Sequence, residues 1–156
     1  MKKINALIFS AALMSNAAYA QKISAEKVPS SVTSAFMSKF PNASKTSWKM
    51  ENPDEYEAEF KMNGKEVSAN FDKAGKWLET ETEMEVSALP VSVNDALKRD
   101  FADYKVKEAS KIESDKNGNC FEAEIKKGKE SYDILFSPEG KMLSKSILKE
   151  KQEDND

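Results

Sequence analysis

An internal repeat constrains the fold of this chain more than any other feature. The segment YEAEF at residues 56–60 recurs as FEAEI at 121–125, and FDKAGKWL at 71–78 recurs as FSPEGKML at 136–143. Both recurrences are about 65 residues apart. Repetition of this length predicts two copies of one supersecondary unit.

Each copy begins with a pattern typical of a short amphipathic helix. A proline stands at the expected first helical position, Pro29 in the first copy and Pro90 in the second, where its missing N–H costs nothing. Pro41 ends the first helix. The second copy has about four extra residues between its helix and its second strand, a difference typical of loops. Apolar residues follow each proline at helical spacing: Val32, Ala35, Phe36 and Phe40, then Val93, Ala96, Leu97 and Phe101.

Period-2 segments separated by turn residues follow each helix and predict antiparallel strands. Asn63-Gly64 is typical of a two-residue hairpin, and residues 72–75 and 137–140 fit type I turns closed by a glycine. The predicted strands are residues 45–50, 55–62, 65–71 and 76–83, then 106–114, 120–126, 129–136 and 141–148.

The sequence therefore predicts an α+β fold. Two tandem α-β-β-β-β repeats, residues 24–84 and 86–148, form one antiparallel, roughly eight-stranded sheet with two helices packed on one face. Residues 149–156 are all polar and are expected to form a C-terminal tail.

Residues 1–20 have the three-part pattern of a secretory signal peptide. Two lysines precede an apolar stretch at 4–14, and Ala18 and Ala20 supply small residues at a cleavage site. That stretch is shorter than the roughly 20 residues of a membrane-spanning helix. We expect a mature chain that begins at Gln21, carries no membrane anchor and is periplasmic or secreted.

The composition excludes several functional classes. The chain has no histidine and one cysteine, which removes histidine-based catalysis, imidazole zinc ligands and an internal disulfide. A net charge of −3 argues against nucleic acid as a partner. No cationic residue is adjacent to Cys120, so we interpret this cysteine as a passive strand residue.

Two acidic patterns in the sequence resemble catalytic or metal sites. Glu57 with Glu59, and Glu122 with Glu124, have the spacing of a carboxyl pair on one strand face. Their repetition in both copies favours a solvated surface over a catalytic pair, since catalysis usually breaks such symmetry. We therefore expect no enzyme activity.

Residues 115–119 resemble the start of a calcium loop. However, Cys120 occupies the required glycine position and Lys126 the position of the bidentate glutamate. A hairpin loop is the simpler interpretation. We expect no metal site and no cofactor.

The strand pattern predicts one apolar face under the helices and one open face that carries the four glutamates. Trp77 alternates with Glu79 and Glu81, which favours Trp77 on the open face, together with its counterpart Met142. The face of Trp48 stays undetermined. The expected binding residues are Trp77, Met142, Glu57, Glu59, Glu122 and Glu124.

The proline-started helices, the strands at 56–60 and 121–125, and the turns and strands at 71–78 and 136–143 resemble the PepSY-like family, also described as β-lactamase-inhibitor-like. The resemblance covers about residues 24–148. It implies two helices on one concave antiparallel sheet, in the periplasm or outside the cell. In the inhibitor that gives the fold its name, the open sheet face grips an enzyme.

The resulting hypothesis is a non-enzymatic exported binding module that contacts an envelope or secreted protein through the open face, as an inhibitor or regulator. The alternative is a sensor of small ligands, basic peptides or cations that uses the acidic rows. Self-association through the open face or an edge strand is a third possibility.

Overall fold

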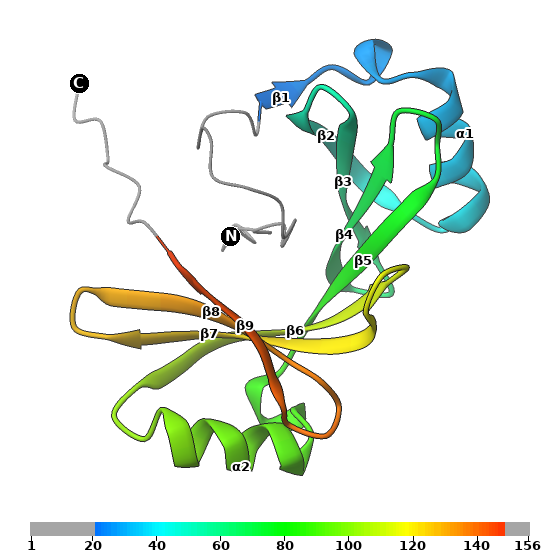
Figure 1. Cartoon of the computed structure of the whole chain (residues 1–156). Coiled ribbons are helices and arrows are strands. Elements are labelled where there is room, and N and C mark those ends of the chain that lie inside the picture. Colours follow the sequence, from blue (N-terminus) through cyan, green and yellow to red (C-terminus); the bar gives the residue numbers. More distant parts are fainter. Residues whose placement is uncertain (1–20, 149–156) are drawn as a thin grey trace. The chain divides into compact units, whose positions relative to one another are not determined.

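The computed structural model describes residues 21–148, and the predicted signal peptide and C-terminal tail lie outside these residues. Within this range the chain forms nine strands in one antiparallel sheet, which follow each other in sequence order, and two α-helices (Figure 1). The predicted α+β fold is confirmed. The one additional strand is β1 (Gln21–Ile23), which pairs with β2.

The chain divides into two compact units, each with one helix. The described part of the first unit comprises residues 21–82 and 113–116, and that of the second comprises 83–112 and 117–148. The first copy contains the 3₁₀ turn Ala25–Lys27, α1 (Ser30–Lys39), β2 (Ser44–Asn52), β3 (Glu55–Met62), β4 (Lys65–Asp72) and β5 (Trp77–Met84). The second contains the 3₁₀ turn Val86–Ala88, α2 (Val91–Asp100), β6 (Lys105–Ser114), β7 (Gly118–Lys127), β8 (Glu130–Phe136) and β9 (Met142–Ile147).

Local sequence chemistry sets the ends of these elements. The predicted ends of the eight strands differ from the observed ones by about two residues or fewer. Pro29 and Pro90 cap the helices one position earlier than expected, and their carbonyl groups accept the first helical N–H bonds. Asn63 and Gly64 both have positive φ, as a type I′ hairpin requires.

The turn before the last strand of each repeat packs against the first turn of that repeat's helix. In the first repeat, the Ser31 hydroxyl donates to the Lys73 carbonyl at 2.9 Å. Gly75 has φ +85°, and a Cβ there would stand 2.5 Å from the Ser31 carbonyl oxygen. Gly140 has the same relation to Ser92 in the second repeat. The repeated glycine therefore permits close contact between turn and helix.

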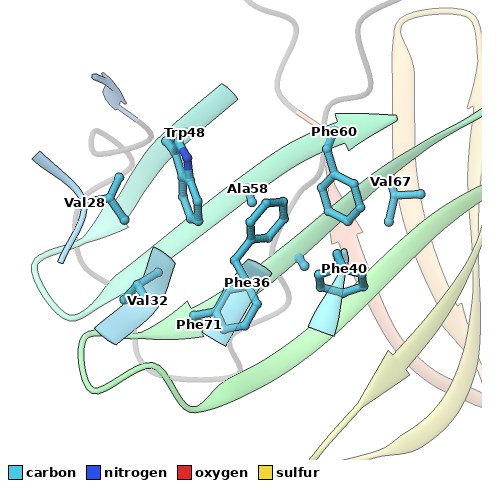
Figure 2. Packing of buried hydrophobic residues seen from close by; sticks show 10 residues of the cluster. Val28, Val32, Phe36, Phe40, Trp48, Ala58, Phe60, Val67 and Phe71 are labelled. Carbon is cyan, nitrogen blue, oxygen red and sulfur yellow. The ribbon is translucent and has the colours of Figure 1, made fainter. Parts of the chain in front are cut away.

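An aromatic core fills the space between α1 and strands β2–β4. Figure 2 shows Phe36 and Phe40 pointing from the helix toward the strands. The Phe36 ring lies 5.1 Å from the Phe60 ring and 5.2 Å from the Trp48 ring, both in edge-on geometry. Trp48 pairs with Ala58 and is buried in this core, so it lies on the helix side of the sheet.

The core of the second unit is mainly aliphatic. The helix α2 contributes Val93, Ala96 and Leu97, which meet strand residues such as Ile125 and Ile134. Each helix therefore covers one face of its own repeat's strands, and the opposite face carries the remaining side chains.

Candidate functional site

The helix-free face is defined here as the set of strand side chains that point away from the helix of the same repeat. In the first unit the strand register aligns Lys49, Glu57, Asn70 and Glu79 across β2, β3, β4 and β5. Residues paired across antiparallel strands share a face, so these four side chains form one row. The predicted placement of Glu57 and Glu59 on the face without a helix is correct.

The placement of Trp77 on this face is wrong. Trp77 pairs with the core residue Phe71, whereas Glu79 pairs with Asn70, so Leu78 is an extra residue in β5. This β-bulge reverses the alternation that the sequence suggests. The Trp77 ring packs against the aromatic core, with the Lys39 ammonium 4.0 Å from its centroid.

The placement of Met142 is wrong for the same reason. Met142 pairs with the core residue Phe136, and the register shifts between Leu135 and Phe136. Leu143 is then the extra residue, about 65 positions after Leu78. The two repeats therefore share the bulge, and neither Trp77 nor Met142 belongs to the helix-free face.

An acidic cluster occupies the helix-free face of the first unit. Lys49 is its central cation: the ammonium lies 3.3 Å from Glu57 Oε2 and 2.5 Å from Glu59 Oε1. Burial opposes the charge on Lys49, but the hydrogen bond to Glu59 and the nearby carboxylates raise its pKa overall. The cluster consists of Glu51, Glu55, Glu57, Glu59, Glu79 and Glu81 around Lys49.

Glu57 is the most buried member, with 0% of its surface exposed. Burial raises its pKa to about 8, against the opposing charge of Lys49, and the carboxyl groups of Glu51 and Glu59 add to the rise. Neither Glu57 carboxyl oxygen has a hydrogen-bond partner of good geometry within the described chain. Burial therefore disfavours the charged form of Glu57 more strongly than the nearby Lys49 favours it, which shifts this carboxyl toward its protonated form.

Glu79 and Glu55 extend the acidic cluster across the sheet. Burial raises the pKa of Glu79 to about 7, and the charges of Glu81 and Glu55 add to the rise. The Glu55 carboxylate accepts hydrogen bonds from the amides of Asn52 and Asn70, each at 3.0 Å. The acidic residues other than Glu57 and Glu59 were not among the predicted site residues, although the alternation of Glu79 and Glu81 with threonines indicates their face.

The helix-free face of the second unit has different chemistry. Glu122 is 7% exposed, and Glu124 is half-buried with a pKa raised by burial and by the charge of Glu108. Beside them, Cys120 packs with Ile112 and Leu135 in a small apolar cluster. The buried position of Cys120 in β7 agrees with its interpretation as a strand residue.

The expectation that this face is open to solvent is wrong at its centre. Glu57 and Glu122 are both buried, and so is Asn70. Each lies on an inner strand of the sheet, and Lys49 on the neighbouring strand β2 reaches Glu57 with its ammonium group. Partly exposed carboxylates remain at Glu59, Glu79, Glu81 and Glu124. They can attract cationic groups or accept hydrogen bonds.

The calcium-like segment forms the β6–β7 hairpin loop, as expected, and Asp115 makes an ion pair with Lys76 at 2.6 Å. Among residues 21–148, no group of three or more acidic or cysteine side chains is arranged to hold a metal ion. No helix in the same range combines the length and apolar character needed to cross a membrane.

Comparison with solved structures agrees with this architecture. A crystal structure from Bacteroides eggerthii, described as "putative periplasmic proteins", has a TM-score of 0.70 and 24% identity over 77% of this chain and 88% of that chain. A BLIP-like protein from Bacteroides fragilis has a TM-score of 0.66 and 26% identity over 77% of this chain and 86% of that chain. No curated protein matches the chain.

A family model described as "Putative beta-lactamase-inhibitor-like, PepSY-like" matches two segments, residues 14–67 and 54–144. Together these segments span most of the chain. Within residues 21–148 they include both α-helices and the whole of strands β1 to β8. The paired match agrees with two copies of one unit that share a helix cap, a turn glycine and a β-bulge. The chain therefore belongs to the PepSY-like, β-lactamase-inhibitor-like family.

Proposed function

We propose that the chain is a non-enzymatic exported module that binds an envelope or secreted protein through the helix-free face, as an inhibitor or regulator. The acidic cluster of the first unit carries this proposal. It places partly exposed carboxylates, among them Glu59 and Glu79, on rigid strands around the cation of Lys49. Sites built on strands hold their contact groups more precisely than sites on loops.

Two further observations support a binding role. The family description refers to β-lactamase inhibition, and one similar structure is named BLIP-like. A likeness of fold supports protein binding only as an analogy. The description of the Bacteroides eggerthii protein as periplasmic, together with the expected signal peptide, supports export.

The buried carboxyls are less suited to catalysis than their raised pKa values suggest. Glu57 is completely buried, so no substrate atom can reach its carboxyl in this conformation. A general acid must lie within hydrogen-bond reach of the reacting group. We therefore assign Glu57 to the support of the face and not to chemistry.

Capture with matched variants tests the proposal. The chain from Gln21 to Asp156 is immobilised and exposed to envelope and secreted extract at low and moderate salt. We expect one salt-tolerant protein to be retained. Combining Glu59→Gln with Glu124→Gln should weaken its retention about tenfold, because one or two well-placed polar contacts are lost. Glu26→Gln, which removes an exposed carboxylate from the 3₁₀ turn, is the control.

The alternative function is a sensor of cationic ligands or basic peptides, and the excess of carboxylates over the single Lys49 favours it. Exposed charge contacts weaken sharply with ionic strength, unlike a packed protein interface. Retention of basic species alone, lost at moderate salt, would favour the sensor. Retention that is unchanged by the Glu59→Gln and Glu124→Gln substitutions would show that neither function uses this face.

A further inference from the structure

Strand β9 concentrates exposed apolar side chains at one edge of the sheet. Among the described strands, β8 is its one neighbour. Five large hydrophobic residues of the described chain are exposed, and three of them stand on β9 or its bulge: Met142 at 46%, Leu143 at 43% and Ile147 at 72%. An apolar edge strand is a template for the addition of another strand.

The backbone of β9 offers hydrogen-bonding groups in the same place. The Leu148 N–H donates to the Ser131 carbonyl at 2.8 Å. In an antiparallel ladder, alternate residues direct both backbone groups toward the same neighbour. By this alternation from Leu148, the two serines of β9 direct their backbone N–H and carbonyl groups toward β8. Lys145 and Ile147 direct theirs toward the outer edge.

Lys145 places a positive charge among these apolar side chains. It pairs with the core-facing Ile134, and its ammonium lies 3.7 Å from the Tyr132 ring centroid and 5.4 Å from that of Phe101. No ion pair joins Lys145 to an acidic residue in the part of the chain that the structure describes. The aromatic rings hold the ammonium on the same side of the sheet as Ile147, which pairs with Tyr132.

We propose that β9 binds an extended segment of a partner protein as an added strand, and that this segment carries an acidic residue opposite Lys145 between apolar residues. This surface is separate from the helix-free face of the proposed function. Main-chain hydrogen bonds would supply affinity, and the alternate side chains would supply specificity.

Charge selects this occupant over a second copy of the chain. A second copy would offer one of its own edge strands, β9 with Lys145 or β1 with Lys22. Neither strand contains an acidic residue. Lysines on edge strands oppose edge-to-edge pairing, because like charges across strands are destabilising. An acidic segment turns the same lysine into an attractive contact.

Two short capped peptides test this proposal, Thr-Val-Thr-Glu-Thr-Val-Thr and the same sequence with lysine in place of glutamate. Binding to the chain from Gln21 to Asp156 is measured by calorimetry up to millimolar peptide, together with amide hydrogen exchange. We expect the glutamate peptide to bind about fivefold or more tightly than the lysine peptide. It should also slow exchange at the amides of Lys145 and Ile147.

Two variants and a control separate the contributions. Lys145→Glu should reverse the preference between the peptides. Ile147→Pro removes one outward N–H and leaves the ladder to β8 intact, so it should abolish binding of both. Val91→Ser, which alters a residue that is 77% exposed at the start of α2, should change neither.

Three results would overturn the proposal. The first is no slowing of exchange at Lys145 and Ile147 at millimolar peptide. The second is an equal affinity for both peptides that Lys145→Glu leaves unchanged. The third is a concentration-dependent increase in mass during sedimentation that Ile147→Pro removes, which would assign the edge to a second copy.

Discussion

Replacing Glu57 with glutamine should make the protein more stable at alkaline pH. Glu57 is completely buried, and its pKa is raised from 4.5 to about 8, mainly by burial. Glutamine has nearly the same shape and carries no charge, so it mimics the protonated carboxyl. The substitution removes the cost of ionising a buried group while it preserves the packing against Lys49.

The sign follows from the protons bound by each state. Between pH 4.5 and 8 the folded chain keeps the Glu57 proton, whereas the unfolded chain has lost it. The free energy of unfolding therefore falls as pH rises through this window, by about 1.36 kcal/mol per pH unit and by up to about 5 kcal/mol in all. The glutamine variant lacks this slope. It should match the parent at pH 5 within about 1 kcal/mol and exceed it at pH 9.

Urea unfolding at pH 5, 7 and 9 measures the effect. The urea concentration at the midpoint reports the free energy of unfolding as long as the dependence of that free energy on urea concentration stays the same. Glu26→Gln is the matched control, because it removes an exposed carboxylate and should follow the parent at each pH. Glu79 and Glu124 also have raised pKa values and contribute a decline of the same sign in all three proteins. A decline in Glu57→Gln as steep as that of the parent would refute the argument, because Glu57 would then be ionised in the folded chain.

Four substitutions test the packing of the first unit, with Gly64→Ala as the matched control for Gly75→Ala. Gly75→Ala should lower the free energy of unfolding by about 2 kcal/mol or more in chemical unfolding, because the added Cβ would meet the Ser31 carbonyl. Gly64 has a similar φ but open space around the position of a Cβ, so Gly64→Ala should lower it by about 1 kcal/mol. Phe36→Ala should cost about 3–5 kcal/mol and change the fluorescence of Trp48, whose ring it contacts. Trp77→Ala should lower the free energy of unfolding by about 2–3 kcal/mol, seen as a lower melting temperature, and should leave partner capture unchanged. Weakened capture without a loss of stability would contradict the assignment of Trp77 to the core.

The sequence predicted the strands well because their signals are local. Apolar residues alternate cleanly in β3, and Asn63-Gly64 has one well-known turn geometry. The placement of Trp77 failed because one extra residue, Leu78, reverses the side-chain alternation, and a bulge has no distinct composition. The raised pKa of Glu57 was also out of reach, since it depends on burial by residues that are distant in sequence.

The two repeats have kept their scaffold and changed their helix-free faces. The glycine beside the helix and the bulge recur at equivalent positions, because each unit needs them to fold. In the first unit, by contrast, Asn70 binds Glu55 within an acidic cluster; in the second, the equivalent Leu135 packs with Cys120. Loss of charge at equivalent positions means that the folding of the unit does not require the cluster. The buried glutamate is common to both units, as Glu57 and Glu122. The carboxylates of Glu55 and Glu79 belong to the first unit alone, since their equivalents are Cys120 and Ser144. Because the fold does not require these two carboxylates, their presence favours a role for that face in binding.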